Sequence, residues 1–259
     1  MLGKLLKYEY KATSRYFIGL YVVLALLTMG NKIMLIIEET SDVQLKVVDI
    51  LFGIIMASYI IAIIAIVVAT FALMLRRFYF NMLKDEGYLS FTLPATVGQH
   101  IASKTIVCIT WFIATIVLTA ISIFVVTYSK DINYARGISE ISRELTQAGS
   151  WGYVIEGIIV IIVSIIGLPL IMYACLSIGQ LYTKHRVVGA IIAYIGYYII
   201  NQVVSSVFLV ISMHSLGYSY DTGAFANQTL IFSIVLSIVF SISSYVVTHY
   251  ILSRKLNLE

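Results

Sequence analysis

The chain has 259 residues, of which 60% are hydrophobic and only 12% are charged. A water-soluble domain of this size could not cover so much apolar surface with polar groups, so the composition indicates a membrane protein. The formal net charge of +4 is compatible with a nucleic-acid partner. The basic residues, however, lie in short segments at the ends of apolar stretches rather than on one domain face, so no nucleic-acid partner is expected.

The first sixteen residues are basic on one side. Their cationic side chains recur at spacings of three and four, which places them on one helical face: Lys4, Lys7, Lys11 and Arg15. Leucines and Tyr10 lie broadly opposite. Residues 1–16 are therefore predicted to form an amphipathic helix in the inner headgroup layer, ahead of a transmembrane domain over 17–259. The alternative is a basic segment that only fixes the orientation of the chain.

Six long apolar stretches then alternate with short polar segments. A helix needs roughly 20 residues to cross a hydrocarbon core of about 30 Å, and a backbone in lipid must satisfy its own hydrogen bonds. The expected fold is an all-α polytopic membrane protein with six transmembrane helices. The predicted spans are 17–37, 50–75, 105–128, 153–178, 187–211 and 228–251.

Lysine and arginine are concentrated in every second polar segment. These segments precede the first span, occupy 76–104 and 184–186, and follow the last span at 254–255. Because short cytoplasmic loops carry an excess of basic residues, both termini are predicted to be cytoplasmic. The segment 129–150 on the opposite side is expected to be a loop of mixed charge.

The cytoplasmic segment 76–104 is the longest and the least ordinary. It contains an acidic pair and then a glycine that can end the preceding helix. A proline ends the run of large apolar residues that follows. The candidate contact residues are Asp85, Glu86, Gly87, Tyr88, Leu89, Phe91, Leu93 and Pro94. An apolar cluster outside any span, rimmed by charge, is typical of a protein contact. The alternative is a short helix at the lipid interface.

Two spans carry polar side chains at helical spacing. Lipid penalises such a face, so the one in span five is predicted to point inward, where either helix packing or a substrate path would use it. Its residues are Tyr194, Tyr197, Tyr198, Asn201, Gln202 and Ser205. In span six the ridge is made of small residues, which favours helix packing. It comprises Ser233, Ser237, Ser241, Ser244 and Thr248.

Motifs for chemistry are missing from the sequence. There is no GxxxxGK[ST] nucleotide-binding loop, no HExxH or paired-cysteine metal motif, and no GxSxG nucleophile motif. The chain is therefore not expected to be an enzyme or to hold a metal or cofactor of its own.

The basic N-terminal segment, six spans and the DEGYLSFTLP sequence at residues 85–94 together resemble the bacterial ABC-2-type ABC transporter permeases. These are the membrane subunits of ATP-driven exporters. The resemblance covers essentially the whole chain, and residues 85–94 are its most specific part. It implies a multi-pass protein of the bacterial plasma membrane in which residues 76–104 provide a coupling helix.

The resemblance also implies partners. Two copies of a separate ATPase subunit would bind ATP and Mg, and a second permease, identical or different, would complete the pathway. Membrane lipid would surround the complex, and an amphipathic substrate such as a peptide, drug or lipid would cross it. The family usually has a re-entrant hairpin between spans five and six. Residues 212–227 are short and polar here, so that hairpin is expected to be missing, abbreviated or formed from the ends of the spans.

Two other functions remain open. An ion-coupled secondary transporter or channel needs charged or ion-coordinating groups near the membrane midplane, where the sequence offers only Asn, Gln, Ser, Thr and Tyr. A non-transporting membrane sensor or scaffold would bind a partner without any flux.

Overall fold

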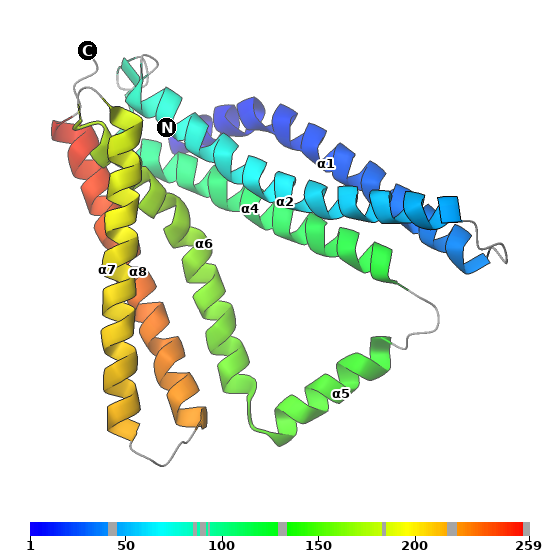
Figure 1. Ribbon diagram of the computed structural model, residues 1–259. Coiled ribbons are helices and arrows are strands. Elements are labelled where there is room, and N and C mark those ends of the chain that lie inside the picture. Colours follow the sequence, from blue (N-terminus) through cyan, green and yellow to red (C-terminus); the bar gives the residue numbers. More distant parts are fainter. Residues whose placement is uncertain are drawn as a thin grey trace. The chain divides into compact units, whose positions relative to one another are not determined.

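The computed structural model describes residues 1–40, 46–84, 87–88, 92, 94–128, 134–182, 185–216 and 222–255. Seven α-helices are formed by these residues, and no strand occurs among them (Figure 1). The helices are α1 (Leu2–Thr40), α2 (Lys46–Leu83), α4 (Val97–Thr127), α5 (Tyr134–Gln147), α6 (Trp151–Gly179), α7 (Arg186–Leu216) and α8 (Thr222–Arg254).

Six of these helices are long and apolar enough to cross a membrane; α5 is the exception. Their lengths run from 29 residues in α6 to 39 in α1. At 1.5 Å per residue these lengths correspond to roughly 43 to 58 Å, which exceeds a hydrocarbon core of about 30 Å. The prediction of an all-α, six-span membrane protein is confirmed. The helices extend beyond the predicted apolar stretches because their polar ends can continue into the headgroup layers.

The chain divides into two compact units. The first contains residues 1–76 and 106–133, and the second contains residues 77–105 and 134–259. The division falls inside α2 and inside α4, so each of these helices contributes to both units.

The first unit joins α1, α2 and α4 through apolar packing and shared hydroxyl groups. Ser122 on α4 lies 2.6 Å from the Thr28 hydroxyl of α1 and 2.6 Å from the Tyr59 hydroxyl of α2. Two helical turns earlier on α4, the Thr115 hydroxyl lies 2.9 Å from the Tyr21 hydroxyl of α1 and 3.1 Å from the Thr70 hydroxyl of α2. Helices in lipid gain little from the hydrophobic effect, so such bonds hold them in register.

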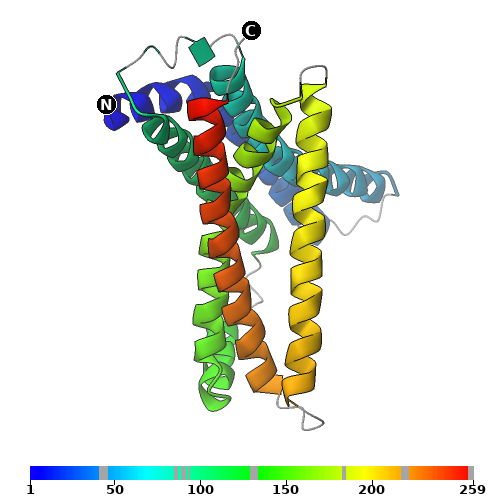
Figure 2. The ribbon, with the colours of Figure 1, turned by 90° about the vertical axis from the view of Figure 1, so that its left-hand side faces the viewer.

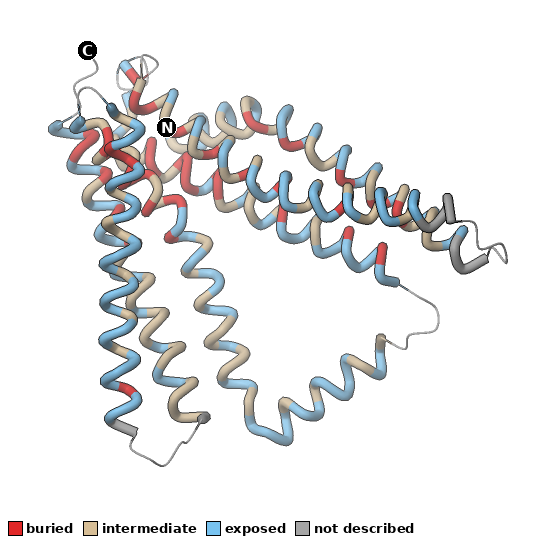
Figure 3. Tube along the Cα trace, viewed as in Figure 1, coloured by how far each residue is buried: buried red, intermediate tan, exposed pale blue. Residues whose placement is uncertain are grey.

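In the second unit, α6 packs against both α7 and α8 (Figure 2). A Cβ added to Gly179 would lie 2.5 Å from the Arg186 carbonyl oxygen and 2.6 Å from the Ala190 nitrogen of α7. Against α8, a Cβ at Gly167 would lie 2.4 Å from the Ser241 hydroxyl. The buried residues of α6 all lie in its second half, from Gly167 onward (Figure 3). Glycines therefore allow the three helices to approach closely at that end.

The small-residue ridge of span six lies on α8. Ser241, Ser244 and Thr248 are buried, and Thr248 is fully so. These three residues have the expected packing role. Helix α7 ends at Leu216 and α8 begins at Thr222. The residues between them are too few for a separate re-entrant hairpin.

The expected loop over 129–150 is wrong for much of its length, because residues 134–147 form helix α5. Apolar residues recur there at helical spacing among the charged ones. That spacing predicts an amphipathic helix, but the high charge of the segment made it resemble a loop.

Candidate functional site

The segment between α2 and α4 follows a tightly packed helix end. The ring of Phe78, near the end of α2, stacks on Tyr173 of α6 with centroids 3.9 Å apart and an angle of 9°. Phe78, Met82 and Leu83 are almost fully buried. The last turns of α2 are therefore fixed to α6 within the second unit.

The segment ends at the start of α4, which is also capped and packed. Thr96 and Gln99 form a reciprocal cap: the Gln99 nitrogen donates to the Thr96 hydroxyl at 3.3 Å, and the Thr96 nitrogen donates to Gln99 Oε1 at 3.4 Å. This capping box satisfies two amide groups at the helix start. Ile101 and Ser103 are then buried, and a Cβ at Gly98 would lie 2.9 Å from the Tyr245 hydroxyl of α8. The sequence TVGQ at residues 96–99 has the spacing of a capping box and could have predicted this helix start.

Part of the predicted contact cluster is described between these two helix ends. The Gly87 nitrogen donates to the Lys84 carbonyl oxygen at 2.7 Å, and the Lys84 ammonium lies 4.5 Å from the centre of the Phe80 ring. Gly87 is buried, whereas Tyr88 is 67% exposed and Pro94 is exposed. The remaining predicted residues lie outside the described part of the chain: Asp85, Glu86, Leu89, Phe91 and Leu93.

The basic N-terminal residues lie in α1, which continues unbroken into the first span. All four are exposed: Lys4, Lys7, Lys11 and Arg15. Lys11 and Arg15 border a hollow of about 340 Å³ that Tyr8, Ala12 and Tyr16 also line. Cations beside tyrosine rings form a surface suited to an anionic lipid headgroup.

The opposite face of the same segment is anchored on α4 within the first unit. Trp111 Nε1 donates to the Thr13 hydroxyl at 2.9 Å, and the Tyr10 hydroxyl lies 2.6 Å from that of Thr110. Phe17 stacks on Trp111 with centroids 4.3 Å apart. These contacts fix the rotation of α1, so the basic residues stay on its exposed side.

The polar stripe of span five lies on α7 and divides into two rows. Tyr197, Asn201 and Ser205 are half-buried, and the Tyr197 ring meets Phe240 of α8 edge-on at 5.0 Å. The second row is exposed within this chain: Tyr194, Tyr198 and Gln202. One row therefore serves helix packing, while the other is open to lipid, to a substrate or to another subunit.

No group of His, Cys, Asp or Glu suited to a metal ion occurs among the residues that the structure describes. Both cysteines, Cys108 and Cys175, are buried, and neither forms a disulfide bond. The chain is a multi-pass α-helical membrane protein. Comparisons with models of protein families, with curated proteins and with solved structures found no match.

Proposed function

We propose that the chain is the permease subunit of an ATP-driven exporter of the ABC-2 type. The protein would lie in the bacterial plasma membrane, with both termini in the cytoplasm. Two copies of a separate ATPase would bind ATP and Mg, and a second permease would complete the pathway. The chain itself would form part of the translocation pathway and would change conformation in response to the ATPase, and it would not hydrolyse ATP.

The observation that carries the proposal is the construction of the segment between α2 and α4. Both of its ends are packed, on one side by the Phe78–Tyr173 stack and on the other by buried Ile101. Tyr88 between them is exposed. A lever must transmit force at its ends and offer a contact surface in its middle. The packed ends and the exposed Tyr88 support this role for the segment.

The exposed row on α7 supports a pathway shared with another subunit. Tyr198 is 56% exposed, and Gln202 beside it carries an amide that lipid would penalise. A second permease or an amphipathic substrate would cover this row. Aromatic rings with polar tips suit a cargo that has both apolar and polar parts.

Reconstitution tests the proposal. The chain purified alone into liposomes should hydrolyse no ATP, and the complex isolated from its native membranes should contain an ATPase with a GxxxxGK[ST] motif and should hydrolyse ATP. Transport by the complex should require ATP. Solute uptake driven by a proton or sodium gradient without ATP would instead identify a secondary transporter or channel, and partner binding without flux would identify a sensor or scaffold.

A further inference from the structure

Helix α5 lies between the spans α4 and α6 in the sequence. None of its residues is buried. It ends at Gln147, and the span α6 begins at Trp151. A chain extends at most about 3.6 Å per residue, so the end of α5 stays within roughly 15 Å of the start of α6. The start of α5 follows the end of the span α4 at Thr127 by seven residues, or at most roughly 25 Å, so both ends of α5 are held near the membrane surface from which α6 enters.

The turn between α5 and α6 has a defined geometry. The Ser150 nitrogen donates to the Leu145 carbonyl oxygen at 2.9 Å and the Gly149 nitrogen to that of Thr146 at 3.2 Å. Gly149 has a φ of 62°, the left-handed conformation that glycine adopts easily. This is a Schellman motif. Trp151 Nε1 also donates to the Thr146 hydroxyl at 2.9 Å. The turn directs α5 away from the axis of α6 (Figure 1).

One narrow face of α5 is apolar. Its residues follow spacings of four, three and four, which places them within an arc of roughly 60°: Tyr134, Ile138, Ile141 and Leu145. Ile138 is 69% exposed and Ile141 is 60% exposed. Two isoleucines on one face of a helix that cannot leave the membrane surface will be covered by acyl chains, because that is the nearest apolar medium.

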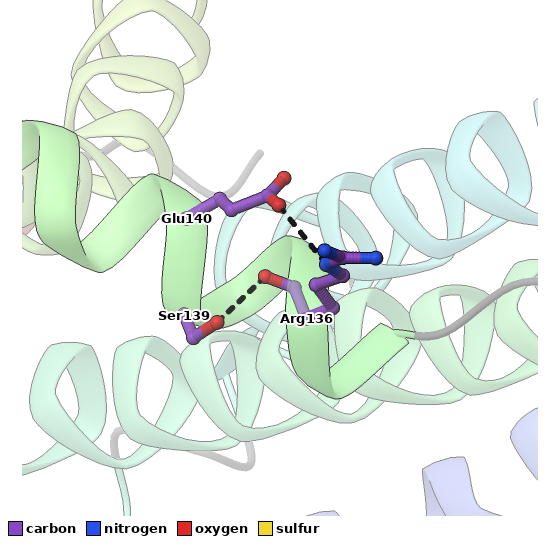
Figure 4. A network of polar contacts seen from close by, with 3 residues as sticks. All are labelled: Arg136, Ser139 and Glu140. Atoms are coloured by element: carbon purple, nitrogen blue, oxygen red, sulfur yellow. Dashed lines mark hydrogen bonds and ion pairs between the residues drawn. The ribbon is translucent and has the colours of Figure 1, made fainter.

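The charged residues of α5 lie on the other side and balance one another. They are Arg136, Glu140, Arg143 and Glu144. Arg136 Nε lies 3.5 Å from Glu140 Oε1, and the Ser139 hydroxyl donates to the Arg136 carbonyl oxygen at 2.8 Å (Figure 4). The helix carries no net charge, so anionic lipid should not attract it. This distinguishes α5 from the basic start of α1.

We infer that α5 is a membrane-surface helix that inserts its apolar face into the lipid leaflet opposite the basic segments. It binds zwitterionic phospholipid through apolar burial. Trp151 at the start of α6 belongs to the same layer, where indole rings are favoured. Through the Schellman turn, α5 holds the start of α6 at a fixed depth. The inference rests on the six spans and is independent of the proposed function.

Site-directed spin labelling of the full chain tests this placement. Single cysteines replace residues on the two faces of α5, Ile141→Cys on the apolar face and Arg143→Cys on the charged face. Both are made in a background of Cys108→Ala and Cys175→Ala. If that background does not fold, the native chain, whose two thiols are buried, provides the subtraction blank. The labelled protein is placed in phosphatidylcholine vesicles, and collisions with oxygen and with a water-soluble nickel chelate are measured.

The label at position 141 should show a severalfold higher ratio of oxygen to nickel collisions than the label at position 143. Adding phosphatidylglycerol should leave that ratio unchanged. Equal nickel accessibility at both positions would overturn the inference, because α5 would then be in water. Shielding of position 141 from both reagents would also overturn it, since protein rather than lipid would cover the face. A ratio that rises with phosphatidylglycerol would contradict the apolar mode of binding.

Discussion

Single hydroxyl groups on α4 connect pairs of helices in the first unit. Ser122 is buried and bonds to both Thr28 and Tyr59, so its loss leaves two buried hydroxyls with one partner fewer. Hydrogen bonds between helices in membranes are worth about 0.6 kcal/mol on average and at most about 1.7 kcal/mol. The contribution of this residue is thus modest but measurable.

Ser122→Ala is expected to lower the free energy of unfolding by about 1–2 kcal/mol, because two interhelical bonds are lost. Unfolding in mixed micelles, followed by circular dichroism, would measure it. The matched control is Ser243→Ala, since Ser243 is exposed and bonds only to the Phe240 carbonyl of its own helix. Equal destabilisation by the two changes would show that Ser122 does not join the helices.

For single residues, the sequence predicted which side chains would pack between helices but not which residues they would contact. The serine ridge of α8 was readable from its spacing alone, because small residues every three or four positions have few other uses in a span. The pairing of Ser122 with Tyr59 was not readable, since residues 63 positions apart meet only after the helices have packed. The stripe on α7 was predicted as one face, and only the structure separates its half-buried row from its exposed one.

At the scale of helices, close approach depends on glycine. Gly179→Ala should push α6 and α7 apart, because the new Cβ would meet backbone atoms of α7 at 2.5 and 2.6 Å. Overpacking of this kind costs about 1–3 kcal/mol. The expected result is a lower midpoint of thermal unfolding in detergent, measured by tryptophan fluorescence.

Gly157→Ala in the same helix is the control for this change. A Cβ at Gly157 would meet nothing within 4 Å, and alanine is the better helix former. The control should therefore leave the midpoint unchanged or raise it. Equal midpoints for Gly179→Ala and the unmodified chain would contradict the tight contact between α6 and α7.

The six spans could be predicted because length and apolar content alone decide which segments cross a membrane. Helix α5 could have been found from the spacing of Ile138, Ile141 and Leu145, but its four charged residues made it resemble a loop. The division of α2 and α4 between two units could not be predicted, since it depends on long-range packing such as the Phe78–Tyr173 stack. The contact residues at 85–94 stay a prediction made from composition, whereas the buried residues on either side, such as Phe78 and Ile101, could not be read from the sequence.

For the molecule as a whole, the central claim is the proposal that residues 85–94 contact the ATPase. Burying one large apolar side chain contributes about 1.5–3 kcal/mol, so a polar replacement of Tyr88 or Phe91 should weaken binding roughly 10- to 100-fold. Reversing the charges of Asp85 and Glu86 should slow encounter with a basic partner. The six spans remain untouched in all of these variants, so insertion into the membrane should be normal.

The direct measurement is ATPase retention on the tagged, membrane-extracted chain. It compares the unmodified protein with Tyr88→Ser, with Phe91→Ser, and with Asp85→Lys combined with Glu86→Lys. Asp221→Ser, in the segment between α7 and α8, is the control. We expect the three changes in the coupling segment to lose most of the bound ATPase and the control to retain it. Full retention by the three variants together with loss by Asp221→Ser would contradict both the docking site and the assigned orientation.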